Sequence, residues 1–281
     1  MPIAPTRAIV DAARRAGAGV GAFNVITLEH AEAVVAAAER TGRPIILQLS
    51  QNAVRFHHGL IHPIAAAMAR VAAASAVPVA LHLDHVDDED LLHEAAAAGF
   101  GSVMFDASTR PYEDNVRATR AAAEWAHRHG LWAEAELGEV GGKDGAHAPG
   151  VRTDPGEAAG YVAATGVDGL AVAVGSSHAM TTRTAVLDLE LVSALRRAVP
   201  VPLVLHGSSG VPDDQLRGAV RHGMVKVNIG TALNVAYTGA VREILARPDH
   251  PTDPRKYLRA ARDAVTGTAA HLIEVLAGSW R

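Results

Sequence analysis

The chain has 281 residues, a formal charge of −4 at pH 7, 49% hydrophobic residues and no cysteine. This composition argues against a disordered tail, a disulfide-stabilised scaffold and a strongly basic nucleic-acid-binding protein. Without thiols, histidine and carboxylate side chains are the ligands left for a transition-metal ion. No apolar run is long enough to span a bilayer and the N-terminus lacks a signal-peptide layout, so we expect a cytoplasmic protein without membrane or nucleic-acid partners.

Short apolar runs follow one another at intervals of roughly 30 residues, the length of one strand plus one crossover helix. Their nearly continuous apolar character is typical of parallel strands that are covered by helices. We therefore predict strands at 21–25, 44–50, 77–85, 102–108, 131–138, 169–178, 202–209 and 224–231.

The helices between these runs have recognisable ends. Thr27 can cap a helix that Gly42 ends, and Asp154 followed by Pro155 starts another helix, which ends at Gly166. No linker or break in composition interrupts the chain. Residues 1–281 are therefore predicted to form a single α/β domain, a (β/α)8 TIM barrel with an N-terminal helix and a C-terminal helical extension.

Polar side chains gather at the predicted strand ends, where barrels of this kind carry their catalytic residues. In chain order these residues are Asn24, Ser50, His82, Asp84, His85, Asp106, Glu134, Glu136, His178, His206 and Asn228. Their shared placement at one end of the barrel predicts an active site there.

Three of these residues, His85, His178 and His206, lie at the tips of different strands and can converge on one ion. Three imidazoles leave a fourth coordination position open, which is typical of a catalytic zinc site, although another divalent cation can use the same ligands. The alternative is that each histidine is a hydrogen-bonded, partly buried residue. Asp84 beside such an ion is a candidate acid/base, or a carboxylate that orients an imidazole.

Two further features of the strand ends have alternative interpretations. Glu134 and Glu136 share one face of their strand and, with Asp106, can hold a second cation, or they can pair with neighbouring histidine or lysine side chains. The loops at 206–210 and 226–231 consist largely of small residues at the usual phosphate site of such barrels, although they can be simple turns.

The sequence resembles the class II, metal-dependent ketose-bisphosphate aldolases, which include fructose- and tagatose-bisphosphate aldolases. The resemblance spans nearly the whole chain and rests on GAFNV at 21–25, LHLDH at 81–85, EAELG at 134–138, TGVD at 165–168, LHGSSG at 205–210 and KVN at 226–228.

This resemblance implies the reversible cleavage of a ketose 1,6-bisphosphate, with fructose or tagatose as the sugar, to dihydroxyacetone phosphate and an aldehyde. It implies zinc held by His85, His178 and His206, and Asp84 as the group that exchanges a proton with the C4 hydroxyl. The implied substrate-binding residues are Asn24, Ser50, Gly207, Ser209, Asn228, Thr231 and Arg255. Because the family arginine reaches the neighbouring subunit, the resemblance also implies a homodimer or homotetramer.

The chain departs from the family pattern at three places. Ala179 stands where a glycine is usual, which affects contacts with phosphate or a monovalent cation; Arg183 stands where relatives often have lysine. Asp144 stands in place of a glutamate and is the candidate for proton transfer at carbon. Residues 139–152 are predicted to form a mobile lid that delivers Asp144 to the substrate.

Other activities remain as alternatives. Schiff-base chemistry is disfavoured because Lys226 is the only strand lysine and is poorly placed. A metal-dependent hydrolase would carry a His-x-His pair on the first strand, where this chain has Phe23-Asn24-Val25. The remaining alternatives are an aldolase for another phosphorylated ketose or deoxyketose, and a non-catalytic partner subunit that binds phosphosugars.

Overall fold

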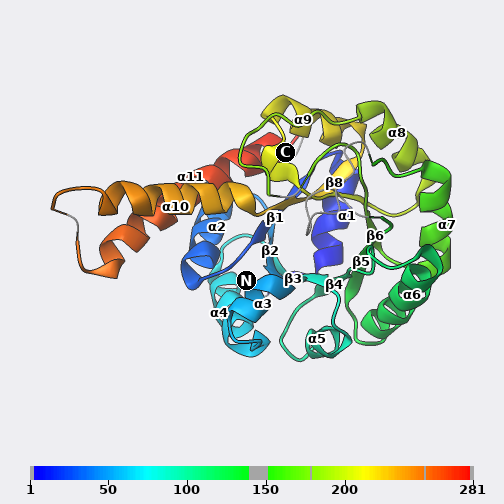
Figure 1. Cartoon of the computed structure of the whole chain (residues 1–281), viewed down its shortest axis with the longest axis horizontal. Helices are drawn as coiled ribbons and strands as arrows, with labels where there is room; N and C mark the ends of the chain where they lie inside the picture. Colours follow the sequence, from blue (N-terminus) through cyan, green and yellow to red (C-terminus); the bar gives the residue numbers. More distant parts are fainter. Residues whose placement is uncertain (1–2, 139–150, 178, 250, 279–281) are drawn as a thin grey trace.

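The computed structural model describes residues 3–138, 151–177, 179–249 and 251–278. Its parallel strands close into a barrel in the order of the chain (Figure 1), which confirms the predicted (β/α)8 architecture. The strands are β1 (Val20–Asn24), β2 (Ile45–Ser50), β3 (Val79–Val86), β4 (Ser102–Phe105), β5 (Trp132–Glu136), β6 (Gly169–Ala171), β7 (Leu203–Leu205) and β8 (Met224–Ile229).

Helices surround the barrel, and one helix precedes it, as predicted. They are α1 (Thr6–Ala16), α2 (Leu28–Thr41), α3 (Gln51–Phe56), α4 (Ile61–Ala74), α5 (Glu89–Glu94), α6 (Tyr112–Arg128), α7 (Pro155–Thr165), α8 (Leu189–Ala198), α9 (Asp213–His222), α10 (Thr231–Leu245) and α11 (Pro254–Leu276), with a short 3₁₀ turn, η1, at Ser208–Gly210.

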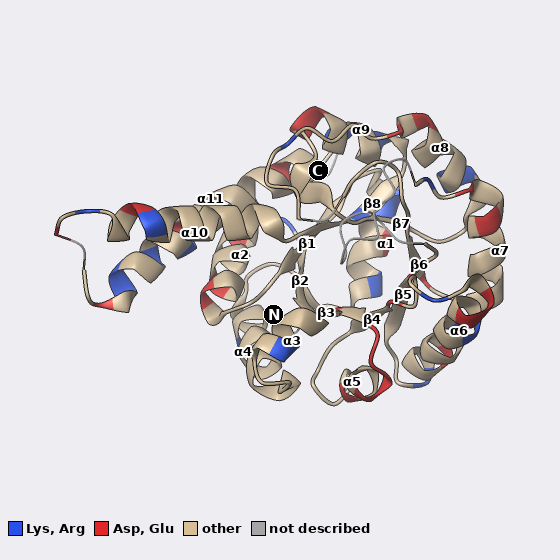
Figure 2. Ribbon diagram, in the orientation of Figure 1, with Lys and Arg blue, Asp and Glu red and all other residues tan. Residues whose placement is uncertain are grey.

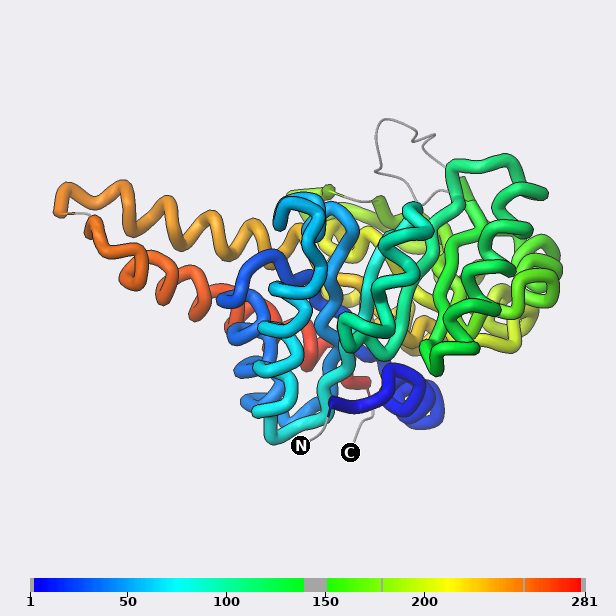
Figure 3. The backbone as a smooth tube through the Cα atoms, turned by 90° about the horizontal axis from the view of Figure 1, so that it is seen from below, coloured from blue at the N-terminus to red at the C-terminus, as the bar shows by residue number. Residues whose placement is uncertain are grey.

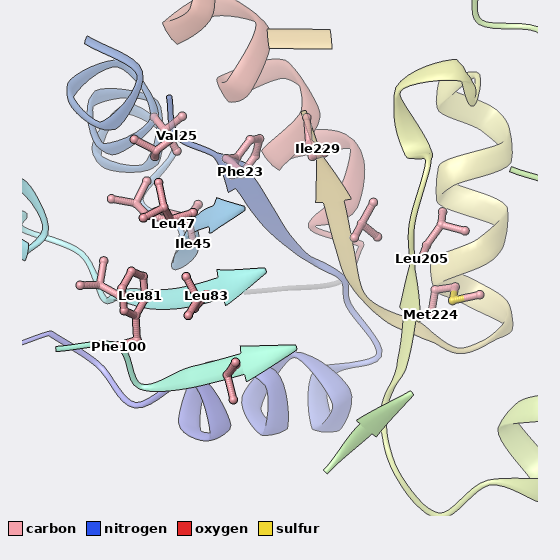
Figure 4. Close-up of a cluster of buried hydrophobic side chains, with 14 of the residues drawn as sticks. Phe23, Val25, Ile45, Leu47, Leu81, Leu83, Phe100, Leu205, Met224 and Ile229 are labelled. Carbon is pink, nitrogen blue, oxygen red and sulfur yellow. The ribbon is translucent and has the colours of Figure 1, made fainter. Parts of the chain in front are cut away.

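Side chains alternate between the two faces of the barrel wall. Phe23, Leu47 and Leu81 belong to the large apolar cluster that joins the strands to the outer helices (Figure 4). The neighbouring residues Ala22 and Ile46 lie opposite one another in the strand register and belong to a second cluster inside the barrel. The interior is thus a separate layer, with apolar residues below and polar residues nearer the carboxyl ends of the strands.

Helix α1 covers the amino end of the barrel. Its Ile9, Val10 and Ala13 are buried against inward-facing strand residues such as Val20 and Val204. Near the two ends of the described chain, the Ala4 amide donates to the carbonyl of Val79 at the start of β3, and the carbonyl of Leu276 accepts from the Gly19 amide just before β1. The opposite end, where the strands finish, is therefore the end left for a binding site.

The helix ends follow the predicted local chemistry. Gly42 and Gly166 take left-handed backbone angles, with φ of 65° and 72°, which a side chain would disfavour. Asp154 accepts hydrogen bonds from the amides of Gly156 and Glu157 at the start of α7. These capping residues fix where α7 begins and where α2 and α7 end.

Several strands are shorter than the predicted runs, and the difference is largest for β6 and β7. β6 and β7 each contain three residues, and the chain beyond Ala171 and Leu205 leaves the sheet. Val172 and Val174 stay fully buried after β6 ends. The run predicted for 169–178 is therefore a strand followed by a buried loop, which hydropathy cannot distinguish from a longer strand.

Helices α10 and α11 form a hairpin that extends beyond the barrel (Figures 1 and 3). The base of α11 packs against α2, where Arg262 Nη1 is 2.7 Å from Glu32 Oε2 and Thr266 Oγ1 donates to the carbonyl of Ala33. Charged residues of both signs lie on the outer helices and on the hairpin (Figure 2). None of the described helices combines the length and apolarity needed to cross a bilayer.

A buried polar network supports the end of β5. Asn115 on α6 donates from Nδ2 to the carbonyl oxygens of Glu136 and Leu137, at 3.2 and 3.0 Å. The Tyr161 hydroxyl on α7 lies 2.7 Å from Asn115 Oδ1 and 3.0 Å from Thr119 Oγ1. Burial raises the pKa of Tyr161, so its phenol stays protonated and donates.

Replacing Tyr161 with phenylalanine is expected to lower the free energy of unfolding by about 1–3 kcal/mol, because buried acceptors lose their donor. Urea denaturation measures this change. Tyr112→Phe is the matched control, since Tyr112 lies on α6 but is 46% exposed, and its change should stay within about 0.5 kcal/mol. Equal losses in both variants would show that the network does not stabilise the fold.

Candidate active site

Inward-facing residues of the first three strands form the polar floor of the site. In the strand register Asn24 lies opposite Gln48, and Gln48 lies opposite His82. Gln48 Nε2 donates to Asn24 Oδ1 and, over 3.3 Å, to Asp84 Oδ2. Below Asp84, His82 is fully buried with Nδ1 2.8 Å from Ser102 Oγ, and burial lowers its pKa so that its ring is neutral.

Asp84 and His85 are consecutive on β3, yet both reach the site. The backbone of His85 has a φ of 51°, and the pairing of β3 with β4 shifts register between Leu83 and Val86. This irregularity overrides the alternation of a regular strand, which would send the two side chains to opposite faces. The local backbone of β3 therefore lets a carboxylate and an imidazole share one side.

The structure brings Asp84, His85 and His206 together. One ligand atom from each lies within 4.8 Å of those of the other two, and the rings of His85 and His206 are 4.8 Å apart between centroids at 68°. These residues come from β3 and from the turn after β7, far apart in the sequence. The predicted convergence of imidazoles is thus present for two of the three histidines, and His178 lies outside the described residues.

Carboxylates hold both imidazoles. His85 Nδ1 is 2.8 Å from Asp106 Oδ2, while His206 Nδ1 and Nε2 are 3.0 Å from Glu136 Oε2 and Glu134 Oε1. At His85, the carboxylate at Nδ1 fixes the ring and directs Nε2 toward an ion. At His206, a carboxylate lies at each ring nitrogen, so binding of an ion there requires one of these two contacts to be given up. Two imidazoles, an aspartate and these supporting carboxylates are donors that suit a divalent cation.

The carboxylates of β5 also have a lysine partner. Glu134 Oε2 is 2.8 Å from Lys226 Nζ, and both side chains are fully buried. Of the two interpretations of Glu134 and Glu136, the structure therefore shows pairing with histidine and lysine neighbours. A second cation at Asp106 and Glu136 stays a prediction.

The loops after β7 and β8 form a cradle of small residues beside this cluster. Gly207 has a φ of 65°, and Ser209 Oγ accepts a hydrogen bond from the Ala232 amide in the first turn of α10. Small residues leave backbone amides accessible, and the N-terminal end of a helix favours negative charge. The pocket that joins cradle and cluster is lined by Asn24, Gln48, Asp84, His85, Ala179, Gly207, Ser208, Ser209, Asn228, Gly230, Thr231 and Asn234.

Comparison with known proteins connects this geometry to a family. The family model for class-II fructose-bisphosphate aldolase matches residues 4–279. The chain belongs to the class II fructose-bisphosphate aldolase family. Members are lyases, and the cluster of Asp84, His85 and His206 is consistent with the metal dependence of this aldolase class.

Individual relatives agree over nearly the full length. The chain is 39% identical over 273 residues to a fructose-bisphosphate aldolase of Geobacillus stearothermophilus, covering 95% of this chain and 94% of that one. A probable fructose-bisphosphate aldolase of Bacillus subtilis is also 39% identical, covering 95% of each chain. The crystal structure of the YdjI aldolase of Escherichia coli K12 is 32% identical, with a TM-score of 0.85 and coverage of 99% and 98%.

Most of the predicted substrate-binding residues line the pocket of this aldolase, and two do not. Asn24, Gly207, Ser209, Asn228 and Thr231 are among its lining residues. The hydroxyl of Ser50 instead accepts from the Ala53 amide and caps α3. Arg255 lies at the start of α11, at the far end of the hairpin from the barrel.

The loops that carry the predicted departures are only partly described. Asp144 and most of the predicted lid at 139–152 lie outside the described residues. Ala179 lines the pocket with a φ of 57°, a conformation that costs an alanine about 1 kcal/mol relative to a right-handed one. Arg183 donates to the Val211 carbonyl and pairs with Asp213. Both partners lie between η1 and the start of α9, outside the cradle.

Three polar residues of the site, Gln48, Lys226 and Asn234, were not predicted to have a role there. Asn234 lies in α10, beyond the predicted loop at 226–231. Gln48 is fully buried in β2 and shares the inward face with Ser50. A glutamine within an otherwise apolar run is the sequence feature that could have indicated its place in the site. Lys226 was considered only as a Schiff-base residue. Its pairing with Glu134 depends on strand positions 92 residues apart (226 − 134), which no local pattern indicates.

Proposed function

We propose that this aldolase reversibly cleaves a ketose 1,6-bisphosphate, with fructose 1,6-bisphosphate as the first candidate and tagatose 1,6-bisphosphate as the second. The observation that carries the proposal is the position of Asp84, His85 and His206, clustered within 4.8 Å beside the cradle after β7 and β8. The cradle supports binding of the ketose C1 phosphate by Gly207, Ser209 and Thr231.

Asp84 is the proposed acid/base of the reaction. Its oxygens accept hydrogen bonds from Gln48 Nε2 and Asn228 Nδ2, each at 3.3 Å, which hold the carboxylate in place at the floor of the pocket. In cleavage, Asp84 takes the C4 hydroxyl proton, the C3–C4 bond breaks, and C4 becomes the aldehyde carbon. The bonding electron pair passes through C3 to the C2 carbonyl oxygen, and Asp144 is the predicted donor of the proton that C3 then receives.

His85 and His206, together with His178, are the proposed ligands of a zinc ion. When bound, such an ion supplies positive charge at the ketose carbonyl oxygen, where negative charge develops. The protein residues set its place: Asp106 and the β5 carboxylates orient the imidazoles, and Ser176 Oγ holds the His206 backbone by donating to its carbonyl over 2.6 Å.

A cleavage assay across fructose, tagatose and related phosphorylated ketoses, with and without chelator, tests this function. Cleavage of a 1,6-bisphosphate that stops on chelation and returns on addition of Zn²⁺ supports it. Phosphosugar binding without turnover in metal-loaded protein would contradict it and favour a non-catalytic partner subunit. Hydrolysis of an ester or amide without aldol cleavage would favour the hydrolase.

A homodimer in which Arg255 completes the partner's site is the proposed assembly. The Arg255 side chain is 86% exposed and lies on the projecting hairpin, away from the pocket of its own subunit. The hairpin also exposes apolar side chains such as Val235 and Leu245 that a second subunit can cover. A guanidinium suits the distal phosphate because it can donate two parallel hydrogen bonds.

Arg255→Ala is expected to lower kcat/KM for a 1,6-bisphosphate about 10–100-fold, the loss of a charged hydrogen-bonded pair, and to leave dihydroxyacetone phosphate binding unchanged. Mixing this variant with Asp84→Ala distinguishes the two subunits. If the arginine acts on the partner, the mixed dimer contains one complete site, so activity returns. Equal loss of affinity for both ligands, or no activity in the mixture, would contradict this role.

A further inference from the structure

Lys226 is fully buried. It lies between Asn228, which contacts the proposed acid/base Asp84, and Glu134, which contacts the proposed metal ligand His206. It shares the inward face of β8 with Asn228, two positions on. Its Nζ donates to Asn228 Oδ1 over 2.7 Å and lies 2.8 Å from Glu134 Oε2. It is not among the described residues that line the pocket. An effect of Lys226 on catalysis must therefore pass through its neighbours.

The chemistry of these groups sets the orientation of the Asn228 amide. An ammonium can only donate hydrogen bonds, so the Asn228 oxygen faces Lys226. The amide NH₂ then faces the opposite way, where Nδ2 is 3.3 Å from Asp84 Oδ1. An ionised carboxylate can only accept, so the reversed amide would place an oxygen against Asp84 and a donor against Lys226. Lys226 and Asp84 thus select the same one of two amide orientations.

Glu134 connects the same lysine to the metal-binding side. Its Oε2 pairs with Lys226 while its Oε1 is 3.0 Å from His206 Nε2. Charged groups that are buried in proteins are paired, and Lys226 is the oppositely charged partner of Glu134. The lysine therefore has one contact toward Asp84, through Asn228, and another toward His206, through Glu134.

We propose that Lys226 is a positioning residue that holds the Asn228 amide with its NH₂ group toward Asp84 and the substrate. This inference rests on the proposed role of Asp84 as acid/base. Removing the ammonium lets the amide reverse and withdraws one donor from the Asp84 carboxylate. Turnover should fall, while phosphate binding at Gly207, Ser209 and Thr231 should be retained because Lys226 does not contact that cradle.

The absence of cysteine from the chain permits a specific chemical test. Lys226→Cys removes the ammonium, and alkylation of the unfolded variant with 2-bromoethylamine, followed by refolding with Zn²⁺, restores an ammonium on a side chain of nearly the same length. The wild-type protein taken through the same treatment is the control for refolding. Lys256→Cys, at an exposed position of α11, is the matched control for alkylation.

We expect Lys226→Cys to lower kcat for bisphosphate cleavage about 10–100-fold, as for loss of a charged hydrogen bond. Binding of inorganic phosphate should stay within about threefold of the wild type, and aminoethylation should restore most of the turnover. Zinc is supplied in excess in these assays, because Lys226 also contacts Glu134 beside His206. Unchanged kcat, or a loss of phosphate binding that aminoethylation does not reverse, would overturn the proposal. An inactive wild-type protein would instead contradict the proposed function.

Asn228→Asp provides a second test that leaves Lys226 in place, in case the cysteine variant does not refold. The new carboxylate can still pair with Lys226, but its other oxygen faces Asp84 and cannot donate. Its kcat should fall at least as far as that of Lys226→Cys. Turnover equal to that of the wild type would show that no donor is needed at this position, and the positioning role would be wrong.

Discussion

Asp84→Ala is expected to lower kcat for ketose bisphosphate cleavage by about 100-fold or more, the usual contribution of a positioned acid/base. The carboxylate is almost fully buried at the floor of the pocket, where Gln48 and Asn228 donate to its two oxygens. No other described carboxylate lines this pocket, so none of those residues can replace it. Steady-state kinetics on fructose 1,6-bisphosphate measures the effect.

The same variant tests whether Asp84 is a metal ligand, because its carboxylate lies within ligand distance of both imidazoles. If Asp84 transfers protons, the variant should bind zinc and dihydroxyacetone phosphate as the wild type does. Asp87→Ala, an exposed aspartate just beyond β3, is the matched control and should keep full activity. If the variant loses zinc together with its activity, Asp84 is a metal ligand rather than the acid/base of the reaction.

His206→Ala is expected to abolish turnover through loss of the metal. Removing one imidazole should weaken zinc binding by at least about 100-fold, more than the loss of an outer hydrogen-bond partner does. The substitution also leaves Glu134 and Glu136 without their shared partner in a fully buried site, which should lower the free energy of unfolding by about 3–5 kcal/mol.

Zinc titration and urea denaturation separate these two effects. His206→Gln is the informative companion, because an amide can still contact one of the carboxylates and retain stability without restoring a strong metal ligand. His271→Ala is the control, since His271 pairs with Asp213 on the outside of the barrel. A His206→Ala protein with normal zinc affinity would exclude this imidazole from the ligand set.

Features governed by local chemistry were predictable from the sequence. The apolar runs, the caps at Asp154 and Gly166 and the polar strand ends each depend on a few neighbouring residues, and the barrel places those strand ends together. The end of β6 was not predictable, because the buried loop after Ala171 is as apolar as a strand. β7 ends at Leu205, before the polar residues 206–209 that the prediction included in the strand.

Side-chain pairings across the barrel could not be predicted from the sequence either. Glu134 had two open interpretations, and only the register of β5 through β8 brings it to Lys226 and His206. The backbone of His85 is a further example. Nothing in the sequence of residues 81–86 predicts a positive φ. It arises at His85, where the pairing of β3 with β4 shifts register.

That backbone angle restricts which amino acids could replace His85, the proposed metal ligand of β3. Asparagine, aspartate and histidine tolerate left-handed backbone more readily than other side chains, whereas β-branched residues resist it strongly. Attempts to change the ion preference of this aldolase by exchange at position 85 therefore have two practical replacements, asparagine and aspartate. Glutamate is disfavoured by its backbone conformation, whatever its qualities as a ligand. Position 206, which follows β7 without a positive φ, permits a wider range of designed ligands.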